Sequence, residues 1–448
     1  MRSTRHVLIA GATVTALLAT ACSGVGAGGS ADGKSINVLM VGNPQMHDIA
    51  KLTQSNFTKE TGIEVNFTVL PENELRDKVS RDIATRAGQY DVVTIGAYEA
   101  AIWDFNGWLR NLNGEFELSS SFDRNDLLEP MMKSLSGSDG RPYAVPFYGE
   151  SSFLMYRKDV FAEKGLTMPE RPTWQQVADL VAKADGAKPG MKGICLRGRP
   201  GWGELGAPLT SMVNTFGGAW FTKDWTARVN TGGFKEATQF YVDLVRKHGE
   251  AGAAQAGFTE CLNAMSQGKV AMWYDATSAA GSLEDPTTSK VAGKIGYAYA
   301  PVEKTDSSGW LWAWAWAMPE TTKKSHLASK FMLWASSKEY EKLVGEKLGW
   351  SRVPAGKRAS TYQIPQYKKA AASFGDITLK SIEQADPSDP GTQPRPTVGI
   401  QFVAIPEFQD LGTKVTQEIS AAIAGKTSVE TALNRAQKLA EDVAEDYR

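Results

Sequence analysis

Residues 35–95 read SINVLMVGNPQMHDIAKLTQSNFTKETGIEVNFTVLPENELRDKVSRDIATRAGQYDVVTI and contain the pattern that decides the fold. Short apolar or alternating strand patterns are separated by helical patterns. The strand patterns lie at 35–41, 63–69 and 90–95, and the helical patterns lie at 49–61 and 72–86. The order strand, helix, strand, helix, strand predicts a parallel sheet with helices on both faces.

The two strand ends in this unit are candidate ligand-binding positions. In open parallel sheets, ligands lie beyond the carboxyl ends of the strands. Residues 42–45, GNPQ, follow the first strand and break it, and residues 96–99, GAYE, follow the third. We therefore expect side chains from both segments to face a binding site.

A second unit of the same type begins near residues 143–148, YAVPFY, so the chain is expected to form two α/β lobes. Further patterns comprise helices at 173–183, 234–247 and 259–267, a strand at 270–274, a return crossing at 295–301, a strand at 310–316, a helix at 324–336 and a helical region at 408–447. A chain of this length exceeds the ~250–300 residues at which single cores usually divide. Two lobes agree with that limit.

The first residues are typical of a secreted protein. Residues 1–21 carry positive charge and then a short apolar run, which predicts a signal peptide too short to span a membrane well. The sequence LATAC at 18–22 resembles a bacterial lipobox, with cleavage before Cys22 and a lipid on its sulfur; Ala19 departs from the usual Leu. Ordinary cleavage nearby is the alternative. Residues 22–34 would then form a lipidated, flexible, Gly-rich tether that anchors the protein to the outer face of the cell membrane.

The charge of the remaining chain argues against a nucleic-acid partner. Loss of residues 1–21 leaves 47 of the 49 basic residues and all 50 acidic residues, a formal charge of −3, with no basic block. Later segments do not reach the ~20 continuous apolar residues of a membrane helix. We expect a soluble body, a monomer, attached only by its lipid.

Two cysteines besides Cys22 are expected to pair. Cys195 and Cys261 would lie in an oxidising compartment, where disulfides persist. Two buried free thiols are the alternative. The remaining motifs argue against several kinds of chemistry: the histidines lack metal-ligand spacing, a nucleotide-binding glycine loop is absent, and residues 149–153, GESSF, lack the second glycine of a nucleophile elbow. We expect neither a metal nor a cofactor.

Several segments together resemble the extracellular sugar-binding proteins of ABC importers, whose best-known relatives bind maltose. These segments are YDVV at 90–93, PFYGE at 146–150, PTW at 172–174, MSQGKVAM at 265–272 and SRVP at 351–354, and their order fits over essentially the whole mature chain. Within that family the chain most resembles polyol binders of the sorbitol and mannitol type. That likeness rests on GNPQM at 42–46, YGESS at 148–152, GWGE at 201–204, MWYDA at 272–276 and GIQF at 399–402.

The resemblance implies a two-lobed, periplasmic-binding-protein-like (type II) α/β fold with hinge crossing strands. One lobe would comprise residues 35–145 and 302–352, and the other residues 146–301 and 353–448. It also implies that the cleft between the lobes captures a polyol or small sugar and delivers it to permease subunits in the membrane. Closure of the lobes on the ligand would bend the crossings near 143–147, 295–301 and 351–354.

A polyol site needs groups that match hydroxyls and apolar C–H edges. Carboxylates, amides and Arg accept or donate hydrogen bonds, and aromatic side chains form walls. The chain has 13 Trp, several of them at expected strand ends or loops. Position and resemblance together select as ligand-binding residues Asn43, Gln45, Arg76, Tyr98, Glu99, Tyr148, Glu150, Trp202, Asp275, Trp310, Trp312 and Arg352.

Some of these residues have plausible structural roles instead. Asp275 could cap a helix, Glu150 could lie in a solvated loop, and Arg352 could fix the hinge through an ion pair. Trp314 and Trp316 share a strand face with Trp310 and Trp312 and are expected in the core.

Two other function classes remain open from the sequence. Glu150 and Asp275 could be the paired carboxylates of a surface glycosidase. The chain could also be a signalling or adhesive lipoprotein that binds a partner and no solute. A binding protein without catalytic activity is the prediction that the whole motif set favours.

Overall fold

The computed structural model describes residues 33–104 and 106–448. The predicted signal peptide and Cys22 lie outside the described residues, as do residues 23–32 of the predicted tether. Among the described residues, no helix is both long and apolar enough to cross a membrane.

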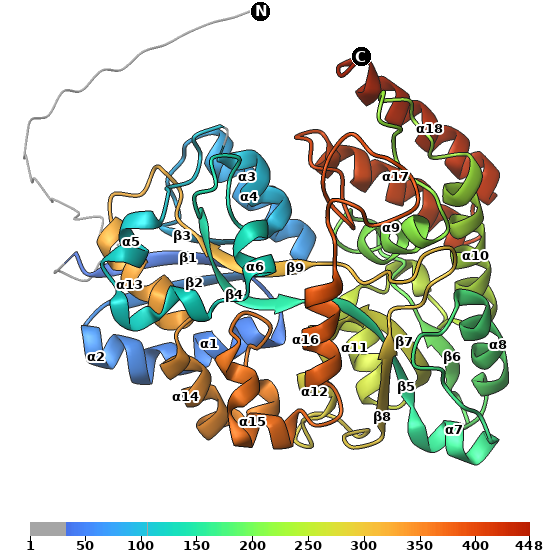
Figure 1. The fold of residues 1–448 in the computed structure, drawn as a ribbon, viewed down its shortest axis with the longest axis horizontal. Helices are drawn as coiled ribbons and strands as arrows, with labels where there is room; N and C mark the ends of the chain where they lie inside the picture. The colour runs from blue at the N-terminus through green and yellow to red at the C-terminus, as the bar shows by residue number, and fades with distance from the viewer. Residues whose placement is uncertain (1–32, 105) are drawn as a thin grey trace, which may run out of the picture. The chain divides into compact units, whose positions relative to one another are not determined.

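The first sheet contains the predicted parallel unit (Figure 1). Its strand order is β2-β1-β3-β9-β4, and β1 pairs in parallel with both β2 and β3. Strand β9 is antiparallel to its neighbours β3 and β4. The strands are β1 (Ser35–Val41), β2 (Glu64–Leu70), β3 (Val92–Ile95), β4 (Ala144–Glu150) and β9 (Trp312–Ala317). The three strands predicted in residues 35–95 are therefore confirmed, with ends shifted by one or two residues.

The second sheet has the order β6-β7-β5-β8. Strands β6 and β7 are parallel, whereas β5 is antiparallel to both β7 and β8. The strands are β5 (Ser152–Arg157), β6 (Lys192–Cys195), β7 (Val270–Ala276) and β8 (Ile295–Tyr299). All seven residues of β7 are buried, as expected of a strand covered on both faces.

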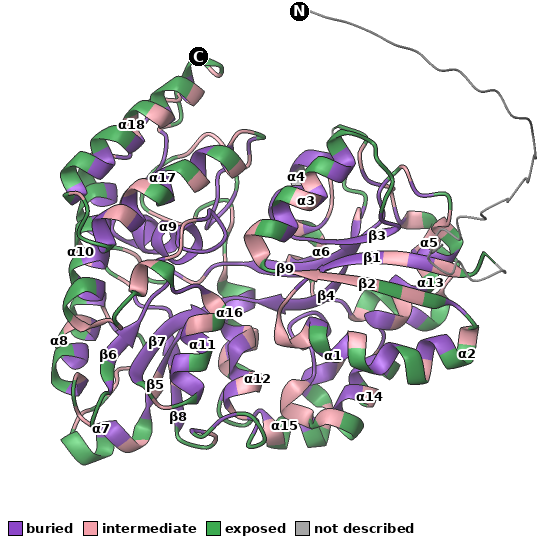
Figure 2. Ribbon diagram, turned by 180° about the vertical axis from the view of Figure 1, so that it is seen from behind, coloured by how far each residue is buried: buried purple, intermediate pink, exposed green. Residues whose placement is uncertain are grey.

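Helices surround both sheets. The first lobe, defined here by the first sheet, includes α1 (Pro44–Thr53), α2 (Lys59–Thr61), α3 (Glu72–Ala84), α4 (Ala97–Trp103), α5 (Asn113–Glu117), α6 (Glu129–Ser134), α13 (Ser325–Ala335) and α14 (Lys338–Leu348). The second lobe, defined by the second sheet, includes α7 (Lys158–Lys164), α8 (Trp174–Ala184), α9 (Gly206–Thr215), α10 (Gly232–His248), α11 (Phe258–Ser266), α12 (Ala280–Leu283), α16 (Gly375–Gln384), α17 (Phe408–Ile423) and α18 (Val429–Glu445). The short α15 (Pro365–Ala370) precedes α16. Figure 2 shows most strands buried, the edge strand β2 partly exposed, and the outer faces of α10 and α18 exposed.

Helix α1 begins earlier than the sequence pattern predicts. Pro44 and Gln45, expected to belong to a break after β1, form its first turn. Proline suits the first helical position because its missing N–H would have no partner there. The helical segment ends at Gly62, whose positive φ of 70° stops it. As a result, Asn43 lies at the junction of β1 and α1, at the carboxyl end of the sheet.

Two predicted lobe limits differ from those of the structure. Strand β4 belongs to the first sheet up to Glu150, which pairs with Trp312, and Ser152 begins the second sheet by pairing with Ala276. The crossing therefore lies at residue 151, because the apolar run at 146–150 continues the first sheet. Beyond the predicted limit at residue 352, residues 357–361 still bond first-lobe groups: the carbonyl of Lys357 accepts from the N–H of Leu128, and Arg358 donates to the carbonyl of Phe122.

The return crossing also lies later than predicted. Residues 295–301, expected to cross, include β8 and remain with the second sheet. The chain reaches the first sheet only at β9, so the crossing follows Gly309. The four tryptophans at 310–316 thus run from the boundary between the lobes into β9, between β3 and β4 of the first sheet.

Candidate functional site

A cavity between the lobes, called here the interlobe cavity, is lined by residues from both. The first lobe provides Asn43, Glu72, Arg76, Glu150, Trp312 and Trp314. The second lobe and the return crossing provide Arg197, Trp202, Gly203, Ala207, Phe258, Ala276, Ser278, Trp310 and Gln401. The lining combines carboxylates, guanidinium groups, an amide, a hydroxyl and indoles.

Four indoles form its aromatic walls. Trp310, Trp312 and Trp314 lie on one face of the chain because side chains alternate along an extended strand. The ring of Trp202, from the second lobe, meets that of Trp312 at 5.8 Å between centroids. Trp314 is buried in the core, as expected, and also lines the cavity. Trp316 does pack in the core, against Phe147 and Phe331.

The glycines on either side of Trp202 let its loop approach the first lobe closely. A Cβ atom on Gly201 would lie 2.4 Å from the side-chain oxygen of Asn73, and one on Gly203 would lie 2.0 Å from a carboxylate oxygen of Glu72. Gly201 also has a φ of 141°, which L side chains rarely adopt. The GWG sequence therefore places an indole against α3 where a bulkier loop could not fit.

Arg76 is the cation of the first-lobe wall. Its guanidinium bonds Glu72 at 2.8 and 3.0 Å and also bonds Glu99. Its Cζ lies 4.1 Å from the centroid of the Trp202 ring, a cation–π contact that crosses between the lobes. Glu99 does not line the cavity; it accepts from Arg76 and from the N–H of Gly96. Glu99 thus orients Arg76 from behind.

Arg197 is the cation of the second-lobe wall, and Asp275 holds it in place. The Nη2 and Nε atoms of Arg197 lie 2.5 and 2.8 Å from the two carboxylate oxygens of Asp275. Asp275 also accepts from the indole of Trp273 and from the N–H of Ala276, and it has no exposed surface. The predicted ligand contact by Asp275 is therefore absent from this arrangement, because its acceptors already face protein donors.

Glu150 lies in the cavity wall as predicted and is not a solvated loop residue. Ser278 of the second lobe donates a hydrogen bond of 2.5 Å to its Oε2. Burial raises the pKa of Glu150 to about 8, against the lowering effects of Ser278 and Arg197. At neutral pH the group is mostly a neutral carboxylic acid, which can both donate and accept.

Two polar atoms in the cavity wall lack hydrogen-bond partners among the described residues. The indole nitrogen of Trp202 is an unpaired donor, and Oε1 of Gln401 is an unpaired acceptor. Both side chains are buried, and both line the interlobe cavity. The amide nitrogen of Gln401 donates to the carbonyl of Leu311, which orients the free oxygen. Buried polar groups are normally paired, so these atoms point to a ligand that both accepts and donates.

Three predicted residues line a neighbouring cavity instead: Gln45, Tyr148 and Arg352. Gln45 donates to the carbonyl of Ser278, across the lobes. Tyr148 accepts from Asn43 at 2.8 Å, which fixes the Asn43 side chain between the two cavities. Arg352 makes the hinge ion pair considered as an alternative from the sequence, and does so twice.

The two partners of Arg352 belong to different lobes. Its Nη2 lies 2.5 Å from a carboxylate oxygen of Asp48 in α1, and its Nη1 lies 2.8 Å from one of Asp285 beyond α12. Burial disfavours the charged form of Asp285, but hydrogen bonds from Thr287 and Arg352 lower its pKa overall. Arg352 therefore connects the lobes without facing the interlobe cavity.

Tyr98 also connects the lobes and does not reach the interlobe cavity. Its hydroxyl donates toward the carbonyl oxygens of Ile405 and Pro406, at 3.0 and 3.2 Å, and accepts from the N–H of Gln409. Its ring packs against Trp202, 4.7 Å between centroids. The position after β3 was predicted correctly, but the side chain turns toward the start of α17.

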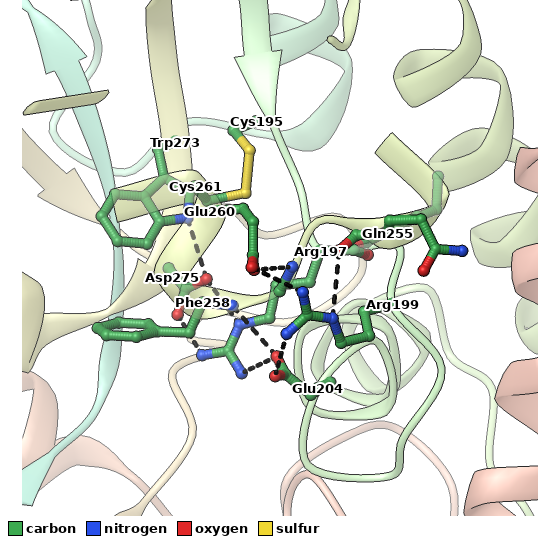
Figure 3. Close-up of a disulfide and its surroundings, with 12 residues drawn as sticks. Cys195, Arg197, Arg199, Glu204, Gln255, Phe258, Glu260, Cys261, Trp273 and Asp275 are labelled. Carbon is green, nitrogen blue, oxygen red and sulfur yellow. Dashed lines mark hydrogen bonds and ion pairs between the residues drawn. A yellow bond between two sulfur atoms is a disulfide. The ribbon is translucent and has the colours of Figure 1, made fainter. Parts of the chain in front are cut away.

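The predicted disulfide between Cys195 and Cys261 is confirmed (Figure 3). It joins the last residue of β6 to α11. Arg197 follows the bonded strand by two residues, and Phe258 precedes the bonded cysteine by three. Both line the interlobe cavity.

Sequence reasoning missed several cavity residues, of which Glu72, Arg197, Phe258, Ser278 and Gln401 are the main polar or aromatic ones. Gln401 stood inside the motif GIQF at 399–402, and Ser278 follows the motif MWYDA by two residues. Arg197 gave a weaker signal, as a charged residue just after the strand that ends at Cys195. Glu72 and Phe258 gave no local signal, because they reach the cavity only through the packing of the lobes.

A family model and a known protein each match most of this chain. A family model described as bacterial extracellular solute-binding protein matches residues 43–342. A mannitol-binding protein of Pseudomonas aeruginosa is 41% identical over 406 residues, which cover 90% of this chain and 92% of that protein.

Two solved structures extend the comparison to the fold. An ABC transporter solute-binding protein of Agrobacterium vitis, with bound D-mannitol, superposes with a TM-score of 0.89 at 46% identity and covers 92% of this chain and 99% of that one. A maltose-bound protein of T. maritima superposes with a TM-score of 0.76 at 20% identity, covering 91% and 99% of the two chains. The second likeness shows the two-lobed fold alone.

Proposed function

The chain belongs to the family of bacterial extracellular solute-binding proteins, and from that premise we propose that its interlobe cavity binds a linear hexitol such as D-mannitol. The bound polyol would be delivered to the permease of an ABC importer in the membrane. The observation that carries the ligand assignment is the pair of unpartnered atoms in the cavity wall, the donor Trp202 Nε1 and the acceptor Gln401 Oε1.

A hydroxyl group is the ligand chemistry that matches this pair. Each hydroxyl can accept from the indole N–H and donate to the amide oxygen, whereas a carboxylate or an ammonium group could satisfy only one of them. The four indoles would cover the C–H edges of the carbon chain. The likeness to a mannitol-binding protein, and to a structure with bound D-mannitol, supports the same class of ligand.

The charges of the wall disfavour an anionic ligand. Arg76 is paired with two carboxylates, and Arg197 is paired with Asp275. Glu150 is mostly protonated at neutral pH because its pKa is raised to about 8. The Arg76 group has two carboxylates for one guanidinium, so an anionic ligand would add to a surplus of negative charge in a buried site.

The predicted ligand-binding residues divide into two groups under this proposal. Direct contacts come from Asn43, Arg76, Glu150, Trp202, Trp310 and Trp312, joined by Glu72, Arg197, Trp314 and Gln401. Supporting roles belong to Gln45, Tyr98, Glu99, Tyr148, Asp275 and Arg352, which orient the contacts or bond the lobes to each other.

Binding is proposed to close the lobes. The protein groups that bind the ligand belong to both lobes, so only a closed cleft can bond all the hydroxyl groups of the ligand. Ligand binding therefore shifts the population toward the closed form. A closed shape would also let the permease distinguish loaded from empty protein.

We further propose that Cys22 carries the lipid anchor and that the body acts as a monomer. Fractionation of cells producing a Cys22→Ala variant tests the anchor, since loss of Cys22 should release the protein from the membrane.

Calorimetric titration with D-mannitol tests the function. We expect one-site binding with a Kd of about 1 μM, which corresponds to a binding free energy of about −8.2 kcal/mol. Ligand at ~100 Kd should stabilise the fold by about 2.7 kcal/mol. D-sorbitol and ribitol test the preference among alditols, and maltose is the ring-sugar control. Chemical recovery of unchanged ligand supports binding without turnover. Binding of maltose with no response to any alditol would overturn the assignment.

A further inference from the structure

We propose that the Cys195–Cys261 disulfide positions the second-lobe wall of the ligand cavity, so that removing it weakens ligand binding through Arg197 and Phe258. The inference rests on the proposed polyol function and adds to it a determinant of affinity that does not touch the ligand. It starts from the position of the bond, between β6, which Arg197 closely follows, and α11, which Phe258 begins (Figure 3).

The bonded cysteines are close to the cavity residues along the backbone. Cys195 ends β6 in register with Trp273 of β7, and Arg197 follows two residues later. Cys261 lies in the first turns of α11, and Phe258 begins that helix. Residues three apart on a helix lie on neighbouring positions of its surface. The bond therefore fixes the distance between the end of β6 and the start of α11, where the two side chains enter the cavity.

The two cavity residues also depend on each other through one network. The Cζ atom of Arg197 lies 5.3 Å from the centroid of the Phe258 ring. The backbone N–H of Phe258 donates to Glu204, whose same oxygen lies 3.5 Å from Nη1 of Arg197. The Phe258 ring packs on Trp273, which donates to Asp275, the partner of Arg197. A shift of α11 would consequently change the surroundings of the guanidinium group.

The other connections between these segments are weaker or more exposed. The N–H groups of Gly198 and Arg199 both donate to the carbonyl of Ala256. Arg199 also pairs with Glu260 at 2.6 Å, but both side chains are about one-third exposed or more. Exposed ion pairs contribute little because water screens them. The cysteines are buried, and their covalent bond does not open in thermal fluctuations as hydrogen bonds do.

Small displacements at this wall should matter for affinity. Binding groups need to be held within about 0.5 Å of the productive geometry, and residues in one network show coupled effects on free energy. We expect the Cys195→Ala/Cys261→Ala variant to bind D-mannitol about tenfold more weakly than the native protein. A bond that served stability alone would lower the melting temperature and leave the Kd of the folded protein unchanged.

A double-mutant cycle separates positioning from general destabilisation. Phe258→Leu is measured with and without the disulfide, and its effect on Kd should be several-fold smaller without it, because the wall is already displaced. Asn43→Ala, at the first-lobe wall, is the matched control and should have the same effect in both backgrounds. Additive effects at Phe258, or an unchanged Kd in the folded disulfide-free variant, would overturn the proposal.

A second variant guards against a folding defect. Cys195→Ala/Cys261→Val fills more of the space that the two sulfur atoms leave, and circular dichroism checks that it is folded. If neither variant folds, the bond is a requirement of the fold and the proposal is overturned. Failure of the native protein to bind any alditol would contradict the proposed function itself, a result distinct from all of these.

Discussion

Arg197 and Asp275 form a bidentate ion pair in the wall between the lobes, with distances of 2.5 and 2.8 Å from the guanidinium nitrogens to the carboxylate oxygens. The carboxylate is completely buried, and the guanidinium lines the cavity. The acid that the sequence marked as a ligand acceptor thus acts as the support of a cation that the sequence analysis did not select. This relationship changes what substitution of Asp275 should do.

Asp275→Ala is expected to lower both stability and affinity. Removing one partner of a buried pair leaves the other charge uncompensated, which costs about 3–5 kcal/mol. Chemical denaturation should show this loss, and titration should show weaker D-mannitol binding because Arg197 loses its orientation. Asp442→Ala, at an exposed position of α18, is the control and should change neither quantity. An Asp275→Ala variant of native stability would contradict the supporting role.

Glu150 should make the stability of the protein depend on pH. Its folded pKa, about 8, lies above the ordinary value of 4.5, so folding takes up a proton between these values. The stabilising contribution of the protonated form is complete below pH 4.5 and is lost as pH rises toward 8, with a slope of up to about 1.4 kcal/mol per pH unit. Glu204, whose burial raises its pKa to about 7, should act in the same direction.

Denaturation of native protein and of Glu150→Gln between pH 5 and pH 9 isolates the share of Glu150. The native curve should fall more steeply than that of the variant, in which only Glu204 and the other groups titrate. Since the amide can also donate and accept, Glu150→Gln should keep D-mannitol affinity within about tenfold, whereas Glu150→Ala should lose about 10–100-fold. Parallel stability curves would show that Glu150 is ionised in the folded protein.

Trp202→Phe tests the unpaired indole nitrogen. The change keeps an aromatic ring but removes the proposed hydrogen bond to a ligand hydroxyl and weakens the contact with Arg76, so binding should fall about tenfold. Trp316→Phe is a closely matched control, because the Trp316 indole nitrogen is also buried and without a partner among the described residues but lies in the core of the first lobe. Equal losses in both variants would count against the cavity assignment.

Tyr98→Phe tests the contact between the lobes. It removes the hydroxyl that bonds residues 405–409, leaving a backbone N–H with no partner in the closed arrangement, at a cost of about 1–3 kcal/mol. Small-angle scattering should show a larger radius of gyration without ligand, and affinity should fall about 3–10-fold. Tyr143→Phe is the control, since that hydroxyl bonds Asp139 within one lobe. An unchanged affinity would mean that this bond does not favour closure.

The sequence was sufficient for the two-lobed fold, but not for the exact limits of the lobes, and only partly for the site. Hydrophobic periodicity located the strands of residues 35–95, and two cysteines in a chain expected to be secreted predicted their bond. Position after a strand located Asn43, Glu150 and Tyr98, but not the direction of each side chain. Tyr98 turns to the second lobe because its hydroxyl bonds the carbonyl oxygen of Ile405, which is more than 300 residues away in sequence. Such long-range packing leaves no local pattern.

A crystal structure of the protein with D-mannitol tests the central claim most directly. The account predicts one mannitol molecule in the interlobe cavity, with hydroxyl groups within hydrogen-bonding distance of Trp202 Nε1 and Gln401 Oε1 and its carbon chain against the indoles. A mannitol molecule bound elsewhere, or an interlobe cavity that stays without ligand at saturating concentration, would contradict it.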